Sequence, residues 1–500
     1  MTHQTRRQLD PRLVGVLVSL LISVYCFLLP GLPNDDAYVY LRTAEIFIDD
    51  GAGAAFAHYG WATYSILIAS LSRLGLSLVS SGYLLNALFF ALLVYAFLSI
   101  ILALSQRRAV AVIGIVTILL YPELNEFRFY LIRDVAFWAL TLIAIWQLLL
   151  YRAEGSAHQS IAFTVSLSLA VLFRAEAILY LLLLPLSLLV DPTLERDKRR
   201  RLAASLIGLS YGFAAFVALA FSLAGINVFE SLSQFFSVYL PFVDATLNPD
   251  PERNAQISRL LFGDHAAIFS SEYLPAVFSL GLLAILFITF FNGLGAYFWI
   301  LAYGLWQRQI DLQQLSQRPL LAAMLINAII LIVFLYLTRY LSSRYAILLC
   351  LLLATQVPIV VLEVLERTTN SRWRRPATGA LFLFCIYCFF DAYTSFGDDR
   401  DYLLDAAAFA AAEASSTGAV ITNNHSIAYF SGLVQNYDEV PRAPSEETVL
   451  ATGPEDVIVL EMVPELADLL GNEDLRRQFR LQASFPDSDD PIIQVFRRLE

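Results

Sequence analysis

Charged residues are scarce in this chain, and that scarcity indicates its class. Asp, Glu, Lys and Arg make up 15% of the 500 residues, while 58% of the residues are hydrophobic. An ordinary soluble domain carries about 25% charged residues. The sequence has no basic tail of the kind that binds nucleic acid, and its net charge of −11 owes much to acids near the C-terminus. The composition therefore predicts a polytopic membrane protein without a nucleic-acid partner.

Cysteine and histidine are also few, with four and five residues. The cysteines all lie inside apolar runs, at Cys26, Cys350, Cys385 and Cys388. Such positions provide no disulfide framework. Cys385 and Cys388 have a spacing that zinc ligands can have, but no His or further Cys accompanies them, so we interpret them as packing residues.

The first long apolar run covers residues 13–32 and is long enough to cross a hydrocarbon core of roughly 30 Å. It has no small-residue cleavage site and further apolar runs follow, so we interpret it as a retained helix and not as a signal peptide. Arg6, Arg7 and Arg12 precede it, and an excess of basic residues marks the cytoplasmic side. The N-terminus is therefore expected in the cytoplasm and residues 33–60 outside it.

Polar residues and a glycine interrupt the next apolar piece, residues 61–78. If this piece crossed the membrane, the following span would carry Gln106-Arg107-Arg108 to the outer side, against the distribution of basic residues. We therefore expect an amphipathic helix that lies along the outer interface.

The same rule predicts about eleven spans in total. After the first, they are expected at residues 83–105, 109–122, 131–151, 159–173, 176–190, 203–224, 276–306, 319–338, 345–365 and 377–396. The long run 276–306 contains Gly293 and Gly295, so it is either one kinked helix or two pieces. An odd number of spans places residues 397–500 outside, which in a bacterium means a chain in the inner membrane with a periplasmic C-terminus.

The C-terminal segment has a different composition, so we divide the chain into a membrane domain, 1–396, and a small α/β domain, 397–500. Residues 401–415 and 464–475 are expected to be helices, and residues 419–422 and 456–460 short buried strands. Residues 478–483 and 492–498 are expected to add edge strands. Within the membrane domain, the roughly 50-residue loop 225–275 is expected to be partly helical and to take part in acceptor choice.

Polar side chains gather in four of the predicted outer loops. The clusters are Asp35, Asp36 and Arg42; Glu123, Glu126, Arg128, Arg133 and Asp134; Arg174 and Glu176; and Arg339, Ser342, Ser343, Arg344 and Tyr345. Arginine suits a lipid-linked phosphate because its planar fork donates two parallel hydrogen bonds and keeps its charge near lipid. A nearby carboxylate can take a proton from an incoming hydroxyl. The alternative is that each arginine only contacts lipid headgroups or pairs with a neighbouring acid.

Two of these clusters resemble a known family. The resemblance rests on four stretches of sequence. They are Asn34-Asp35-Asp36-Ala37-Tyr38, continuing to Arg42 and Glu45; Asp50-Gly51-Ala52-Gly53; Tyr64-Ser65-Ile66-Leu67; and Leu172-Phe173-Arg174-Ala175-Glu176. They are similar to the first outer loop, and to an Arg-x-Glu element, of GT-C glycosyltransferases of the integral-membrane mannosyl- and arabinofuranosyl-transferase group. A more distant likeness is to protein O-mannosyltransferases and lipid A aminoarabinose transferases. The resemblance covers the membrane part of the chain.

The resemblance implies a GT-C fold and an inverting transfer from a polyprenyl-phosphate sugar to a lipid, glycan or protein acceptor. It implies that the acidic pair supplies the base, with Asp36 the first choice and Asp35 the second. Asp134 is predicted to orient a substrate, or alternatively to pair with Arg133. The predicted donor-phosphate ligands are Arg133, Arg174, Arg339 and Arg344. The predicted cavity residues are Tyr38, Arg42, His58, Glu176 and Tyr345.

Three alternatives stay open beside this prediction. Relatives of this kind work without a metal, but Asp35 and Asp36 are also suited to hold Mg²⁺ or Mn²⁺. Instead of contacting a substrate, Arg42 could pair with Glu45 or Asp35, and His58 could be exposed to solvent. A transporter or flippase, or a polymerase of lipid-linked glycans, would use similar substrates. Transporters place their charges near the membrane midplane on broken helices, whereas these charges gather at one interface, which favours the enzyme.

Overall fold

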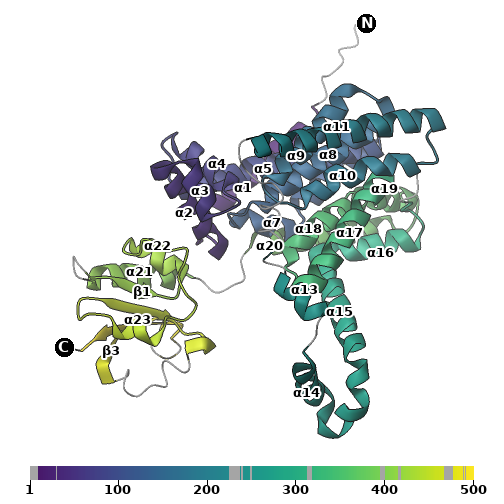
Figure 1. Ribbon diagram of the computed structural model, residues 1–500. Coiled ribbons are helices and arrows are strands. Elements are labelled where there is room, and N and C mark those ends of the chain that lie inside the picture. Colours follow the sequence, from purple (N-terminus) through teal and green to yellow (C-terminus); the bar gives the residue numbers. More distant parts are fainter. Residues whose placement is uncertain are drawn as a thin grey trace. The chain divides into compact units, whose positions relative to one another are not determined.

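The computed structural model describes residues 9–29, 31–223, 237, 240–247, 250–311, 318–394, 400–414, 418–466, 477–487, 489 and 491–499. These residues form mostly helices, together with one four-stranded sheet near the C-terminus (Figure 1). They fall into two compact units. The first comprises Met1–Leu20, Phe89–Glu126 and Asp134–Tyr393, and the second Leu21–Leu88, Phe127–Arg133 and Thr394–Glu500. The segment after the first apolar run thus groups with the C-terminal domain, a division different from the single boundary at residue 396 that composition predicts.

All the regular elements among the described residues of the first unit are helices. Its helices are α6 (Arg108–Leu119), α7 (Pro122–Asn125), α8 (Asp134–Glu154), α9 (Ala157–Val171), α10 (Ala177–Ser187), η2 (Leu188–Val190), α11 (Arg196–Leu223), α13 (Leu240–Leu247), α14 (Pro251–Ser270), η3 (Ser271–Tyr273), α15 (Leu274–Leu294), α16 (Tyr297–Trp306), α17 (Arg318–Thr338), α18 (Ser343–Ala354), α19 (Val357–Thr368) and α20 (Arg374–Tyr393). Helices α1 (Pro11–Leu28) and α5 (Leu78–Leu104) contribute to both units.

Among the described residues, eight helices are long and apolar enough to cross a membrane. The number is nine if Arg108–Leu119 and Pro122–Phe129, which bend by 56°, count as one span. The sequence predicts about eleven, and the difference lies in helix length. Ala157–Val171 has 15 residues, which at 1.5 Å per residue extends about 23 Å and falls short of a core of roughly 30 Å. The prediction of a polytopic helical protein is confirmed, and an exact number of spans is not.

Several predicted breaks in the chain have the expected local causes. The run 276–306 divides into two pieces, α15 and α16, where Gly295 adopts a φ of 51°, a left-handed conformation that glycine adopts at little cost. Gly155 ends α8 with a φ of 71°, and Ser156 then forms a capping box with Gln159 at the start of α9. Parts of the loop 225–275 form α13, α14 and η3, which confirms its partial helicity; its residues 225–236 lie outside the described ranges.

The second unit contains the segment between α1 and α5 and the C-terminal domain. Its elements are α2 (Asp35–Asp50), α3 (Ala52–His58), α4 (Thr63–Ser72), η1 (Glu126–Phe129), α21 (Asp401–Glu413), β1 (Val420–Thr422), α22 (His425–Ser431), α23 (Glu446–Leu450), β2 (Val457–Glu461), η5 (Pro464–Leu466), β3 (Phe479–Phe485) and β4 (Ile493–Arg498). Helix α4 has ten residues, too few to span a bilayer, in keeping with the interfacial helix predicted there.

The sheet of the C-terminal domain has the order β1-β2-β4-β3. Strand β1 pairs with β2 in parallel, and β4 pairs with β2 and β3 antiparallel. Alternate residues of β2 face opposite sides: Val457 and Val459 pack with α21, and Ile458 and Leu460 with Val449 of α23. Figure 1 shows the helices α21 and α22 along these strands.

Most of the predicted elements of this domain are confirmed, and one assignment is wrong. Strand β4 was expected at an edge, but it lies between β2 and β3 because its buried Ile493 and Val495 complete the core under α21. Of the helix expected at 464–475, the structure describes only η5, and the remainder lies outside the described residues.

Helix α2 packs directly on the C-terminal domain. Tyr38 and Leu41, one turn apart on the same face, are fully buried in a cluster with Ala428 and Tyr437. The Tyr38 hydroxyl donates to Ser426 Oγ at 2.8 Å, and the ring of Tyr38 stacks on His425 with a centroid separation of 6.0 Å. The domain therefore holds α2 through Tyr38, which lies one turn after Asp35, and through Leu41.

The buried Tyr38–Ser426 hydrogen bond can be tested by a double-mutant cycle. We expect Tyr38→Phe and Ser426→Ala each to lower the stability of α2 by about 1 kcal/mol. The double variant should lose little more than either single one, because both remove the same bond. Hydrogen exchange of the α2 amides measures the loss. Ser70→Ala, which removes an exposed hydroxyl bonded only within α4, is the control, and strictly additive losses would contradict the bond.

Candidate functional site

The candidate site of the first unit is built around Arg174, in the turn between α9 and α10. Its Nη2 and Nε donate to the two carboxylate oxygens of Glu176, at 2.6 and 3.3 Å, and its Nη1 donates to Asp134 Oδ1. The pairing with Glu176 is bidentate, the strongest geometry available to an arginine and a carboxylate. Asp134 is the first residue of α8, where the helix dipole also favours a negative charge. One guanidinium thus joins two carboxylates from two segments.

Two of the three charged side chains are largely held away from solvent, and the third, Glu176, is 29% exposed. The side chains of Arg174 and Asp134 are 12% and 4% exposed. Burial by itself would lower the pKa of Arg174, but the charges of Glu176 and Asp134 outweigh it and raise that pKa above its ordinary value. Burial by itself would raise the pKa of Glu176, but the charge and hydrogen bonds of Arg174 lower it below its ordinary value. The cluster therefore stays ionised near neutral pH.

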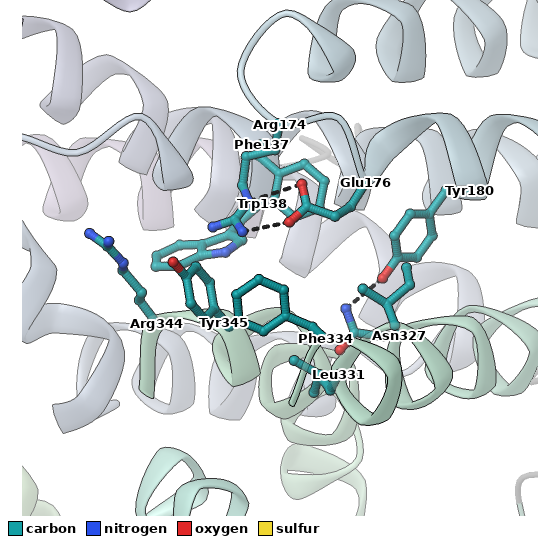
Figure 2. Close-up of a pocket in the computed structure, with 11 residues that line it drawn as sticks. Phe137, Trp138, Arg174, Glu176, Tyr180, Asn327, Leu331, Phe334, Arg344 and Tyr345 are labelled. Carbon is teal, nitrogen blue, oxygen red and sulfur yellow. Dashed lines mark hydrogen bonds and ion pairs between the residues drawn. The ribbon is translucent and has the colours of Figure 1, made fainter. Parts of the chain in front are cut away.

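Aromatic rings and a second arginine complete the surroundings of this cluster (Figure 2). The guanidinium of Arg174 lies 4.6 Å from the ring centroid of Tyr345 and 5.8 Å from that of Phe137. Arg344, in the first turn of α18, lies 5.4 Å from the same Tyr345 ring. These are cation–π distances. Two arginines, one from the α9–α10 turn and one from α18 itself, therefore lie at cation–π distance from one tyrosine ring.

Beside this cluster lies a pocket whose lining comes from α8, α10, α17, α18 and the α9–α10 turn. The lining residues are Phe137, Trp138, Arg174, Glu176, Tyr180, Asn327, Ile330, Leu331, Phe334, Arg344 and Tyr345. Its cavity volume is about 20 Å³, which is room for roughly one water molecule. A phosphate or sugar would therefore enter only after lining side chains move. At its far end the Asn327 amide donates to the Tyr180 hydroxyl at 2.5 Å, as Figure 2 shows.

The structure brings together five of the residues that the sequence singled out. They are Asp134, Arg174, Glu176, Arg344 and Tyr345. The alternative partner named for Asp134 was its neighbour Arg133, but Asp134 pairs with Arg174. Both ends of the Arg174 fork are engaged by carboxylates, so Arg174 is set up to hold Asp134 and Glu176 in place.

Arg339 belongs to the same unit but has a different environment. It follows the last residue of α17 with a φ of 58°, a left-handed conformation that is uncommon for arginine. Its guanidinium lies 5.0 Å from the ring centroid of Phe278 on α15. It is not among the residues that line the pocket described above.

The remaining predicted residues lie in the second unit. Asp35 and Asp36 form the first turn of α2. Arg42 pairs with Glu45 at 3.1 Å, one of the two alternatives named for it. Tyr38 is buried against the C-terminal domain, where its hydroxyl donates to Ser426. That the acidic pair and the Arg174 cluster share one cavity stays a prediction.

His58 and Arg133 also have defined partners within the second unit. His58 Nε2 lies 2.8 Å from Asp438 Oδ2, and the Asp438 side chain is only 3% exposed, so the histidine meets the C-terminal domain and not solvent alone. The guanidinium of Arg133 lies 4.8 Å from the ring of Trp61 and 5.7 Å from that of Tyr59. Both aromatic residues belong to the segment between α1 and α5, so Arg133 links residues 127–133 to that segment.

Sequence reasoning missed three residues of these sites. Asn327 and Tyr180 lie in apolar helices, where a lone amide or hydroxyl is a recognisable signal because it must find a partner. Asp438, by contrast, gives no local signal. Among the described residues, no group of three or more His, Cys, Asp and Glu side chains could hold a metal ion, and the structure leaves the alternative of Mg²⁺ or Mn²⁺ at Asp35 and Asp36 untested.

Removing the shared arginine should strongly destabilise the first unit. Arg174→Leu leaves two carboxylates buried without their cation, which we expect to cost about 3 kcal/mol or more of unfolding free energy. Adding Asp134→Asn and Glu176→Gln should restore part of that loss. Thermal unfolding of the full chain in detergent measures both. Arg107→Gln breaks an exposed pair with Glu366 and should cost at most about 1 kcal/mol; an equal effect of Arg174→Leu and Arg107→Gln would refute the role of the cluster.

Comparison of this chain with known protein families finds no match. Comparison with curated proteins finds none either. The likeness to GT-C glycosyltransferases therefore rests on the motifs of the sequence, and the functional argument rests on the arrangement of the described residues.

Proposed function

We propose that this protein is an inverting glycosyltransferase of the GT-C type, which transfers a sugar from a polyprenyl-phosphate carrier to a lipid, glycan or protein acceptor. The observation that carries the proposal is the convergence of Asp134, Arg174 and Arg344 from three segments far apart in the sequence. Such a set of fixed charges beside aromatic rings and apolar helices suits a substrate with an anionic head and a lipid tail.

The roles follow from the contacts of each arginine. Arg174 is the positioning residue, because its hydrogen bonds hold Asp134 and Glu176. Arg344 contacts the donor phosphate, with Arg339 and Arg133 as further candidates, and stabilises the negative charge that develops as the phosphate leaves. The ring of Tyr345 lies at cation–π distance from both guanidinium groups, and Tyr345 lines the same cavity. Its ring is suited to the face of a sugar.

The reaction needs one base and no redox partner. Asp36, or else Asp35, takes the proton of the acceptor hydroxyl, and the hydroxyl oxygen forms a bond to the anomeric carbon. The bond from that carbon to the phosphate oxygen breaks, and its electron pair leaves with the polyprenyl phosphate. Attack opposite the leaving group inverts the anomeric centre. No divalent ion is required by this scheme.

A second candidate function is transport or flipping of a lipid-linked glycan. It is favoured by two breaks in the helices of the first unit, the 56° bend after α6 and the break at Gly295 between α15 and α16. Transporters build their substrate and ion sites from such discontinuous helices. The ion cluster at Arg174 favours the enzyme, and activity in solubilised protein separates the two functions, since transport requires a closed membrane.

The base assignment is testable with single substitutions in the first turn of α2. We expect Asp36→Asn to lower sugar transfer by about 10²- to 10⁴-fold, the usual contribution of general base catalysis, and Asp35→Asn to have a smaller effect. The assay follows labelled sugar from polyprenyl phosphate in membranes. Asp49→Asn, in the exposed last turn of the same helix, is the matched control. Full activity in both Asp36→Asn and Asp35→Asn would rule out the acidic pair as base.

The orientation is testable separately. We propose that the chain lies in the bacterial inner membrane with its N-terminus in the cytoplasm and its C-terminal domain in the periplasm. A cysteine added after Glu500 should then react with a membrane-impermeant thiol reagent in cells whose outer membrane has been permeabilised, whereas one added before Arg6 should not. Labelling that requires rupture of the inner membrane would reverse the assignment for the C-terminus.

A further inference from the structure

Glu123 is a carboxylate that the proposed reaction does not use. It lies in α7, directly after α6, and its carboxyl group packs against the break between α15 and α16. A Cβ atom built on Gly295 would overlap Glu123 Oε1. The carboxyl group thus fills the space that any side chain at position 295 would need.

The backbone amide of Glu123 donates to its own carboxyl group, but the two neighbouring tyrosine hydroxyls donate elsewhere. The hydroxyl of Tyr121 donates to the carbonyl of Gly293, and the hydroxyl of Tyr297 donates to the carbonyl of Thr117 at 2.7 Å. These bonds satisfy backbone groups near the two helix breaks. Glu123 Oε2 is itself buried and has no hydrogen-bond partner within the described residues.

No cation compensates Glu123 in the part of the chain that the structure describes. The charged groups that face it are the carboxyl groups of Asp391, on the adjacent α20, and of Glu126. The other titratable neighbours are neutral thiols and hydroxyls, namely Cys350, Cys388, Tyr121, Tyr297 and Tyr387. A carboxylate in this place would be buried without a cation and would face like charges, both of which favour the protonated acid.

We propose that Glu123 is a proton-binding site, which carries its proton near neutral pH while α15 and α16 meet at Gly295 as described. Ionisation would require water or a cation to reach the carboxyl group, so proton release favours an arrangement in which this packing opens. Low pH therefore stabilises the described arrangement. The ligand is the proton alone, and the inference does not depend on glycosyl transfer.

Infrared spectroscopy of the full-length protein in lipid vesicles tests this directly, without an activity assay. The carbonyl-stretch band of a protonated carboxylic acid should be present near neutral pH and lose intensity in Glu123→Gln. Glu252→Gln, in the exposed first turn of α14, is the control, because Glu252 is not among the charged groups that face Glu123, and it should leave the band unchanged. An identical band in the native chain and in a folded Glu123→Gln variant would overturn the proposal.

A second variant tests the role of the packing at the break. Gly295→Ala should force the carboxyl group from its place, and the acid band should then disappear on titration at lower pH than in the native chain, towards the value of about 4.3 for an exposed glutamate. If Gly295→Ala retains the native titration, the packing against Gly295 does not hold the proton. Should this variant fail to fold, Glu123→Gln alone decides the proposal.

Discussion

The buried pairing of Arg174 with Glu176 and Asp134 is the interaction on which the first unit depends. In a chain so poor in charge, each buried ion must have a partner, because an isolated one costs far more than a lost apolar contact. The planar guanidinium meets this demand for two carboxylates at once. It thereby holds the start of α8 against the α9–α10 turn, and its contact with the Tyr345 ring extends the link to α18.

In the second unit, hydrogen bonds and aromatic contacts partner the buried polar groups in place of a cluster of ions. Tyr38 serves α2 as both an apolar core residue and a donor to Ser426, and His58 reaches Asp438 of the C-terminal domain. The helix that begins with Asp35 and Asp36 is consequently held on the face adjoining these acids. For an enzyme this is useful, since a base must keep its orientation to be effective.

The two sets of buried polar groups in the first unit, the Arg174 cluster and Glu123, differ in whether their charges are compensated. At Arg174 the opposite charges compensate one another, which suits a permanent frame around a substrate head group. At Glu123 the described residues offer no cation, and the acid lies against a helix break. An uncompensated acid of this kind responds to its surroundings, because its charge depends on whether water reaches it. A static frame and a titratable acid can thus coexist in one helical unit.

Local sequence determined much of this structure. The apolar runs, the glycines between α15 and α16, the short helix α4 and the strands β1 and β2 are all set by neighbouring residues, so their patterns predict them. The Arg-x-Glu turn is likewise local, because Arg174 and Glu176 are two residues apart. Only the tertiary structure decided that Asp134 joins them, that Arg174 is engaged by carboxylates, that His58 meets Asp438, and that β4 lies inside the sheet. Those partners are separated by tens to hundreds of residues, and packing of whole helices and strands, which no local pattern encodes, brings them together.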